Sequence, residues 1–265
     1  MKKTLIVGNW KMHLSTHEAS VLVHRLHQHI PVHRDVEVVL APSMLSLQPL
    51  SLEVDRRKFR LAAQNAFYKD EGAFTGEVSF TMLRDLVHYA IIGHSERRIY
   101  FDENLDIVRD KVAAAVRNGI APILCIGETR QEHLDGEGRQ VLHDQLTTAL
   151  ANLTSEDMED IVLVYEPQWT ITSFGGKPAK PDEVEKAIAY MRHQVSELYG
   201  AATAENIRVL YGGSVDTHDV RAYLEAEGCD GVLVGAASLN YRQFSDIVDT
   251  AFKVQHTRAG KDGES

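Results

Sequence analysis

Apolar runs of strand length recur along the whole chain and alternate with longer stretches of helical spacing. The eight runs, rich in β-branched residues, are Leu5–Gly8, Val36–Ala41, Phe59–Gln64, Tyr89–Gly93, Ile120–Gly127, Ile161–Tyr165, Ile207–Tyr211 and Gly231–Gly235. The helical stretches include Glu18–Ile30, Leu105–Arg117, Arg139–Leu153, Asp182–Tyr199, Asp219–Ala226 and Tyr241–Phe252. Because the runs are nearly continuous in apolar residues and helices separate them, the pattern predicts a parallel sheet covered on its faces.

Eight units of strand and helix favour an α/β chain folded as a single closed (β/α)8 barrel. The length of 265 residues suits one domain of that kind. An open doubly wound sheet is the rival, but Gly8-Asn9-Trp10 after the first run does not match the glycine pattern G-x-G-x-x-G of dinucleotide-binding sheets. We therefore expect a barrel over residues 1–254 and a polar, disordered tail over residues 255–265.

The charge balance and the cysteines limit the partners and the compartment. The chain has 28 Lys and Arg against 38 Asp and Glu, a net charge of -10, which disfavours nucleic acid and anionic membranes. No apolar stretch is long enough for a membrane span, and the apolar part of the N-terminus is too short for a signal peptide. Cys125 and Cys229 lie far apart within apolar runs, which indicates buried thiols and a cytoplasmic protein.

One ionisable side chain follows each of three strands: Lys11 the first, His94 the fourth and Glu166 the sixth. In a parallel barrel the C-terminal strand ends open onto one face, so these residues can converge. A carboxylate, an imidazole and an ammonium suit proton abstraction next to a carbonyl group. Taken singly, each has an ordinary alternative: a solvated surface charge for the first and third, and for His94 a helix start capped by Ser95.

Glycine-bearing turns after the seventh and eighth strands suggest a phosphate site. The turns are Tyr211-Gly-Gly-Ser214 and Val234-Gly235-Ala236-Ala237-Ser238. Backbone N–H groups at such turns bind phosphate, and barrels often place phosphate after these two strands. The alternative is a pair of ordinary strand-to-helix turns.

The first helical stretch is rich in histidine, with His24, His27, His29 and His33. No carboxylate or thiolate completes a recognisable ligand set around them, so we expect a solvated helix face and no metal site.

The motifs together resemble those of the triosephosphate isomerase family. The matching segments are Asn9-Trp-Lys-Met12, Gly72-Ala-Phe-Thr-Gly-Glu77, Gly93-His-Ser-Glu-Arg-Arg98, Pro122-Ile-Leu-Cys-Ile-Gly-Glu128, Tyr165-Glu-Pro167 and Tyr211-Gly-Gly-Ser-Val215. They occur in order over nearly the whole chain. The resemblance implies a homodimeric barrel without cofactor that interconverts dihydroxyacetone phosphate and glyceraldehyde 3-phosphate through an enediolate.

The resemblance also implies a role for each matching site residue. Glu166 would be the base and His94 a neutral electrophile, beneath a loop that closes to exclude water. Asn9 and Lys11 would contact the substrate, and Glu96 would be the charge partner of the lysine. Thr75 would reach into the site of the neighbouring subunit. The remaining residues implied for the substrate and its phosphate are Thr172, Ser214, Gly235 and Ala236, with Tyr211 in support.

The chain departs from the family at three places. The segment Trp169-Thr-Ile-Thr-Ser-Phe-Gly-Gly-Lys177 is longer by two residues than the usual closing loop, and it has Thr172 where the family has a phosphate-binding glycine, with Gly175 as a fallback donor. Ala236 replaces the second of two adjacent glycines, which would introduce strain if the position required a positive φ. Asp102 replaces another glycine, at a position expected to be peripheral.

These departures leave two alternatives to a triosephosphate isomerase. A longer closing loop and Ala236 would also suit an isomerase of a larger sugar phosphate, such as erythrulose phosphate. The altered loop would also suit a barrel that binds sugar phosphates without turnover, although the intact acid and base residues speak against it.

Overall fold

The computed structural model describes residues 2–171 and 176–262, with the side chains of the last helix described through Arg258. Eight parallel strands form a closed barrel in chain order, in which Leu5 to Gly8 of the first strand pair with Gly231 to Val234 of the last. The strands are β1 (Thr4–Asn9), β2 (Val36–Ala41), β3 (Phe59–Ala63), β4 (Tyr89–Ile92), β5 (Ala121–Ile126), β6 (Val162–Tyr165), β7 (Arg208–Tyr211) and β8 (Gly231–Val234). The predicted (β/α)8 barrel is thus confirmed.

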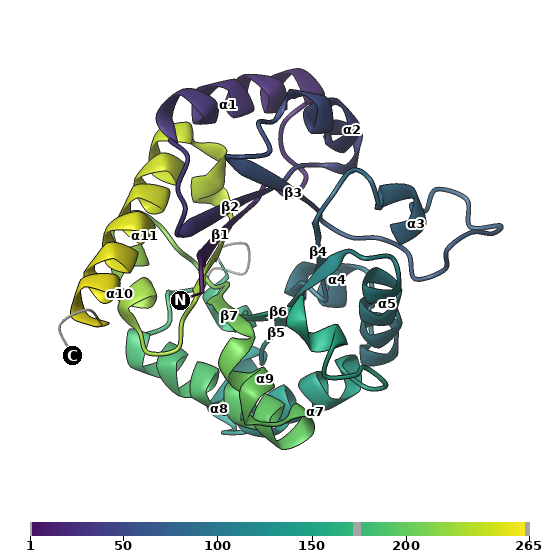
Figure 1. Ribbon diagram of the computed structural model, residues 1–265. Helices are drawn as coiled ribbons and strands as arrows, with labels where there is room; N and C mark the ends of the chain where they lie inside the picture. The colour runs from purple at the N-terminus through teal and green to yellow at the C-terminus, as the bar shows by residue number, and fades with distance from the viewer. Residues whose placement is uncertain (1, 172–175, 263–265) are drawn as a thin grey trace.

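Helices surround the barrel as an outer ring (Figure 1). The α-helices are α1 (Thr16–His29), α2 (Met44–Glu53), α3 (Phe80–Leu83), α4 (Ser95–Tyr100), α5 (Leu105–Arg117), α6 (Arg130–Leu134), α7 (Gly138–Ala149), α8 (Pro181–Tyr199), α9 (Ala201–Asn206), α10 (Val220–Glu225) and α11 (Tyr241–Asp262). Short 3-10 helices occur at η1 (Asp157–Glu159), η2 (Gln168–Thr170) and η4 (Ala236–Leu239). The sequence pattern missed α2, because Pro49 lies inside it and its apolar residues do not gather on one face.

Two apolar clusters explain why the strands are apolar at almost every position. Leu5 and Val7 belong to the cluster that fills the barrel, whereas the intervening Ile6 belongs to the larger cluster between the sheet and the helices. Alternate side chains of a strand point to opposite faces, and here both faces are buried. Both predicted buried thiols are confirmed, because Cys125 and Cys229 are buried and free.

The C-terminal segment differs from the predicted disordered tail, because α11 continues through residues 255–262. Gln255 is only 5% exposed, and its amide nitrogen donates to the carbonyl oxygen of Lys2 at 3.0 Å. The Gln255 amide oxygen accepts from the Thr4 hydroxyl at 2.9 Å. Arg258 donates to the backbone carbonyl of Cys229. The composition of the segment could not reveal these contacts, since every partner is far away in the sequence.

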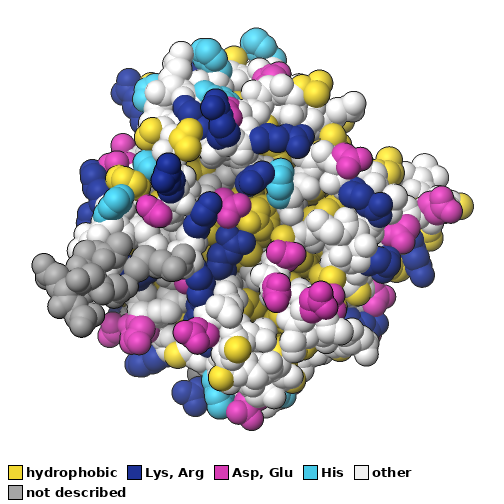
Figure 2. Space-filling view, viewed as in Figure 1, with side chains coloured by type: hydrophobic (Ala, Val, Ile, Leu, Met, Phe, Trp, Pro, Cys, Tyr) yellow, Lys and Arg dark blue, Asp and Glu magenta, His cyan; other side chains and the backbone are white. Residues whose placement is uncertain are grey.

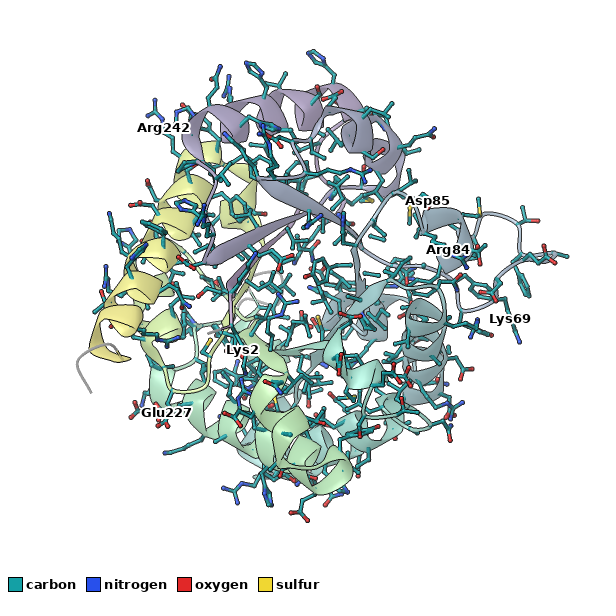
Figure 3. All side chains as sticks on the ribbon, viewed as in Figure 1. Lys2, Lys69, Arg84, Asp85, Glu227 and Arg242 are labelled. Atoms are coloured by element: carbon teal, nitrogen blue, oxygen red, sulfur yellow. The ribbon has the colours of Figure 1, made fainter. Side chains whose placement is uncertain are left out.

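Polar side chains close the N-terminal end of the barrel, opposite the face where the strands end. Glu37 accepts hydrogen bonds from the Tyr89 hydroxyl at 2.9 Å and from Arg208 at 3.0 Å. Lys2, which is labelled near the middle of this end in Figure 3, lies 3.7 Å from the carboxylate of Asp230. These groups are remote from the C-terminal strand ends.

The segment between β3 and α3 projects outward from the ring of helices (Figure 1). It carries Phe74, which is 42% exposed, and Met82 in the following helix α3 is 65% exposed. Apolar side chains on a projecting segment are typical of a contact surface.

No helix in the described part of the chain is both long and apolar enough to cross a membrane. Figure 2 shows basic and acidic side chains interspersed on the face that it presents, as expected for a surface without a large field of one sign.

Asp102 lies just after α4 with a φ of 51°, in the left-handed region that favours glycine. We expect Asp102→Gly to raise the free energy of unfolding by up to about 1 kcal/mol, because glycine removes the strain of the Cβ atom. Asp106→Gly, in the first turn of α5, should instead lower it by about 1 kcal/mol. Urea unfolding of both variants would test this, and a loss of stability in Asp102→Gly would contradict it.

His27 is not a fully solvated residue of α1, in contrast to the prediction. Its Nε2 atom accepts from the backbone N–H of Asp55 at 3.1 Å, and its ring meets Phe59 edge to face. Burial lowers the pKa of His27, and the nearby Lys58 ammonium lowers it further. The folded protein therefore binds this proton less tightly than the unfolded chain does.

The free energy of unfolding should accordingly fall when the pH is lowered and His27 becomes protonated. This neutral histidine contributes fully to the free energy of unfolding above its pKa of about 6.5 in the unfolded chain. The contribution is lost as the pH falls through the lower pKa of the folded protein. We expect the free energy of unfolding to drop less between about pH 7.5 and about pH 5 in His27→Gln, which keeps an acceptor but cannot be protonated. An unchanged pH dependence in urea titrations of this variant would contradict the assignment.

Candidate active site

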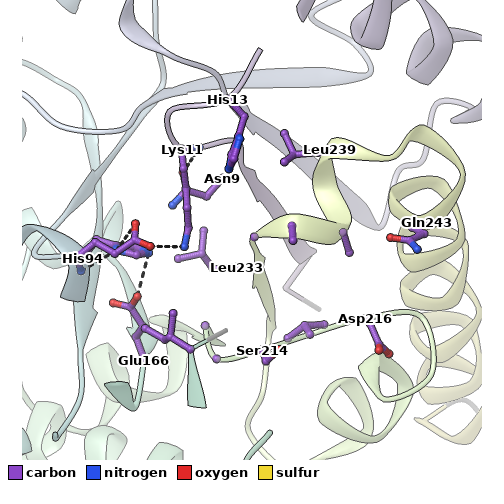
Figure 4. Close-up of a pocket in the computed structure, with 18 residues that line it drawn as sticks. Asn9, Lys11, His13, His94, Glu166, Ser214, Asp216, Leu233, Leu239 and Gln243 are labelled. Carbon is purple, nitrogen blue, oxygen red and sulfur yellow. Dashed lines mark hydrogen bonds and ion pairs between the residues drawn. The ribbon is translucent and has the colours of Figure 1, made fainter. Parts of the chain in front are cut away.

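A cavity of about 460 Å³ opens at the C-terminal ends of the strands. Its lining includes Asn9, Lys11, His94, Glu96 and Glu166, so the structure brings the predicted polar residues into one site. Figure 4 shows the side chains of Lys11, His94 and Glu166 converging from different strand ends.

The start of α4 orients the imidazole of His94. It is the N-cap residue of this helix, and its Nδ1 atom accepts from the backbone N–H of Glu96 at 3.2 Å. An acceptor nitrogen carries no proton, so the ring proton of the neutral tautomer is on Nε2. This nitrogen lies 2.9 Å from the Glu166 carboxylate and can donate to it. The cap of α4 is thus His94, whereas the ordinary alternative placed Ser95 there.

Gly93 makes this placement of His94 possible. It has a φ of 72°, and a Cβ atom at this position would lie 3.1 Å from the carbonyl oxygen of Cys125. A larger residue would therefore combine backbone strain with a close contact just before the imidazole.

Glu166 is almost completely buried, with 2% of its surface exposed. Its two carboxylate oxygens accept from the backbone N–H and from the hydroxyl of Ser95, each at 3.0 Å. Its backbone N–H donates to Ile126 at 2.7 Å, which continues the pairing of β6 with β5 beyond the last ladder residue. Because Ser95 is the first residue of α4, the start of this helix orients both oxygens of the carboxylate.

Cys125 lies beneath this carboxylate in the barrel interior. Burial raises the pKa of its thiol well above the usual value, and the negative charge of Glu166 raises it further. The thiol therefore stays neutral and does not compete with the carboxylate for a proton.

Lys11 reaches the site from a strained backbone. Its φ is 51°, in a region that is costly for a residue with a side chain. The backbone N–H donates to the amide oxygen of Asn9 at 3.1 Å, and Gln64 donates to the Lys11 carbonyl oxygen at 2.9 Å. The ammonium pairs with the Glu96 carboxylate at 2.6 Å, as the resemblance implies. The strain is maintained by these contacts on either side.

The turns after β7 and β8 form the opposite wall of the cavity. Ser214, Gly235 and Ala236 all line it, as predicted. Ala236 begins the 3-10 helix η4 and is absent from the residues with positive φ, so alanine is accommodated without backbone strain. These turns place short side chains and backbone groups across from the imidazole and the carboxylate.

Two further predicted residues are Thr172 and Thr75. Thr172 and its fallback Gly175 fall outside the described residues. Thr75 is exposed on the segment that projects between β3 and α3, and it does not line the cavity of its own chain.

Tyr211, which was predicted to support the site, is fully buried beneath the segment that follows residue 175. Its hydroxyl accepts from the backbone N–H of Ala179 at 3.3 Å, and Tyr223 donates to the carbonyl oxygen of the same residue at 2.8 Å. The two tyrosine rings stack with centroids 4.3 Å apart. Together they fix the end of the segment that leads from the site into α8.

The sequence reading missed several residues that the fold brings to the site. The sequence indicates only a helix cap at Ser95, whereas in the structure Ser95 donates two hydrogen bonds to Glu166. Glu128 accepts from the Tyr165 hydroxyl at 3.0 Å and from the Trp169 indole at 2.9 Å, which fixes the segment after β6. Its position after β5, in the same strand-end pattern as Glu166, was the signal that could have identified it. Further lining residues that no pattern indicated are His13, Ile171, Asp216, Leu239 and Gln243.

Comparison with known proteins identifies close similarity over nearly the whole chain. The model of a family described as triosephosphate isomerase matches residues 4–251. A triosephosphate isomerase of Dehalococcoides mccartyi is 39% identical over 256 residues, which cover 97% of this chain and 99% of the relative. Triosephosphate isomerases of Caldanaerobacter subterraneus (38% identical, covering 94% of this chain and 100% of the relative) and Citrifermentans bemidjiense (40%, covering 94% and 98%) are similar over the same extent.

Proposed function

Since the chain belongs to the triosephosphate isomerase family and interconverts dihydroxyacetone phosphate and D-glyceraldehyde 3-phosphate, we propose that Glu166, His94 and Lys11 carry this reaction. The observation that supports these roles best is the distance of 2.9 Å between the Glu166 carboxylate and Nε2 of His94, within a cavity walled on its other side by the turns after β7 and β8.

Glu166 is the base of the proposed mechanism. Its carboxylate takes a proton from C1 of dihydroxyacetone phosphate, the C–H electron pair forms the C1–C2 double bond, and the carbonyl oxygen on C2 becomes negatively charged. The same carboxyl group then returns its proton to C2, while the C1 hydroxyl loses a proton and becomes the aldehyde. Each carboxylate oxygen accepts one hydrogen bond from Ser95, which leaves further lone pairs on both oxygens to take the proton.

His94 is the proposed electrophile. Its Nε2–H donates to the substrate oxygen that gains negative charge, and a neutral imidazole can then move a proton between the oxygens on C2 and C1. The backbone N–H of Glu96 donates to Nδ1, which favours the tautomer with the proton on Nε2 that this role needs.

Lys11 and Asn9 complete the catalytic side of the proposed site. The Lys11 ammonium offsets the negative charge of the enediolate and of the phosphate, and Glu96 holds it in place. Asn9 is buried at the end of β1 and fixes the backbone of Lys11. On the other wall, Ser214, Gly235 and Ala236 are proposed to bind the phosphate, with backbone N–H groups as donors.

A homodimer is part of this proposal. Met12 is 96% exposed next to Lys11, Phe74 is exposed on the projecting segment that carries Thr75, and Met82 is exposed on the adjoining helix α3. These apolar side chains suit burial against a second copy, whose site Thr75 would then approach. Light scattering during gel filtration would test the dimer, and a monomer at the concentrations used for assay would contradict it.

We also infer that the protein works in the cytoplasm, in the glycolytic and gluconeogenic interconversion of the two triose phosphates. Support comes from the two free, buried cysteines, which suit a reducing compartment. Cell fractionation with an antibody against the chain would test this location.

The experiment that tests the function follows dihydroxyacetone phosphate formation from glyceraldehyde 3-phosphate, coupled to its reduction with NADH. We expect rapid turnover by the purified chain, and much slower turnover of a four-carbon analogue. Absence of isomerisation, or faster turnover of the four-carbon substrate, would contradict the triose assignment.

A further inference from the structure

A second cavity, of about 570 Å³, lies beside the active site, and the two share no lining residue among those that the structure describes. It is bounded by α4, by α6, by the start of α8, and by residues on both sides of segment 172–175, namely Trp169 and Lys177. We call it the hinge groove. Its volume falls in the range of sites that hold small molecules.

The charge of the hinge groove is opposite to that of the whole protein. Arg130, Lys177 and Lys180 line it, and the single carboxylate among the described lining residues is that of Glu183. Glu183 already accepts from the backbone N–H of Lys180 at 2.9 Å, as part of the start of α8. Within the described residues, neither the Arg130 guanidinium nor the Lys177 ammonium has an ion pair. A chain with a net charge of -10 therefore gathers cations in this groove.

The same groove has an aromatic wall that is held rigid. The Trp169 ring packs against that of His133, with centroids 4.4 Å apart and planes tilted by 33°, and its indole N–H donates to the buried Glu128 carboxylate. His133 also approaches this carboxylate, at 3.3 Å. A ligand ring could therefore stack here without first ordering the indole.

Exposed aliphatic side chains extend the apolar surface. Leu134 is 69% exposed and Ile99 is 43% exposed, and both line the groove. Apolar surface beside unpaired cations suits a ligand with a flat ring and several negative charges, because the ring covers the apolar wall while the anionic groups meet Arg130, Lys177 and Lys180.

We propose that the hinge groove binds a small, ring-bearing polyanion, with carboxylate or phosphate groups on a flat ring. The ring lies against Trp169 and His133, and the anionic groups pair with Arg130, Lys177 and Lys180. The site is separate from catalysis, so binding does not depend on the isomerase mechanism.

The probe for the test is benzene-1,3,5-tricarboxylate, compared with inorganic pyrophosphate, which has the charge without the ring. Tryptophan fluorescence reports on the groove, since the other tryptophan, Trp10, is completely buried. We expect saturable quenching by the tricarboxylate, a matching isotherm in titration calorimetry, and affinity for pyrophosphate that is lower by about tenfold. Absence of saturable binding in both measurements would overturn the proposal.

Matched variants locate the site. The double variant Arg130→Gln/Lys180→Gln should weaken tricarboxylate binding at least about tenfold. The control Arg34→Gln/Lys186→Gln makes the same change of net charge at exposed positions outside the groove and should leave binding unchanged. An equal loss in both double variants would show an effect of net charge only.

Lys11→Met distinguishes the groove from the catalytic cavity. We expect tricarboxylate binding to persist in this variant, although its isomerase activity falls. Binding that is lost in Lys11→Met but retained in Arg130→Gln/Lys180→Gln would place the probe in the active site and overturn the proposal. Urea unfolding of each variant would establish that the folded protein is being compared.

Discussion

Replacement of Glu166 by glutamine is expected to lower kcat for triose phosphate isomerisation by about 10⁴-fold, at the upper end of the effect of a general base. The same carboxylate removes the proton from one carbon and returns it to the next, so an amide at this position disables both transfers. The fold should survive, because glutamine has the same shape, although its amide nitrogen cannot accept from Ser95 as a carboxylate oxygen does. Initial rates in both directions, with substrate varied, would measure the loss.

Two further variants distinguish the loss of the base from a change in the shape of the site. Glu166→Asp keeps a carboxylate but withdraws it by about the length of one bond, and a displacement of about 1 Å should reduce kcat by about 10²-fold. Glu37→Gln removes a carboxylate at the opposite end of the barrel, where it pairs with Tyr89 and Arg208, and should leave kcat unchanged. A reduction of less than about tenfold in Glu166→Gln would rule out Glu166 as the base.

Replacement of Lys11 by methionine is expected to reduce kcat/KM by about 10²–10³-fold. The ammonium is the cation that the structure places beside the catalytic pair, at 2.6 Å from Glu96. Its loss removes the charge that offsets the enediolate and the phosphate, so both kcat and KM should worsen. Steady-state kinetics with each triose phosphate would show whether both parameters change.

The unpaired Glu96 carboxylate is a second possible cause of that loss, and a double variant distinguishes the two causes. If the damage came from the carboxylate left without its partner, Lys11→Met/Glu96→Gln would regain activity. We expect no recovery. Lys2→Met, which removes the ammonium beside Asp230 at the other end of the barrel, should leave kcat/KM unchanged. Recovery in the double variant would mean that Lys11 acts only by neutralising Glu96.

Local sequence patterns were sufficient to predict the barrel and to identify the three polar residues at its strand ends. Strands such as β6 are buried on both faces, so an apolar residue at every position directly indicates a covered parallel strand. Parallel pairing then requires that residues just after β1, β4 and β6 meet on one face, wherever they stand in the chain. Lys11, His94 and Glu166 were located in this way.

Features that depend on contacts between distant segments were not predictable. The tail was expected to be disordered, yet Gln255 is buried against Lys2 and Thr4, which lie at the other end of the sequence. The sequence did not determine the backbone conformation of Ala236, because its φ depends on how η4 packs and not on the residue alone. In the same way, the role of Ser95 in holding Glu166 required the distance between two strand ends.

The order and composition of the chain by themselves determined the eight-stranded barrel, its two buried thiols and the set of residue types at the strand ends, because burial and periodicity act within a few neighbouring residues. The tertiary structure alone decided the tautomer of His94, the hydrogen bonds of Glu166, the path of α11 and the gathering of cations in the hinge groove. Each of these depends on hydrogen bonds and electrostatic fields that act over a few ångströms in space, between groups that lie tens of residues apart in the chain.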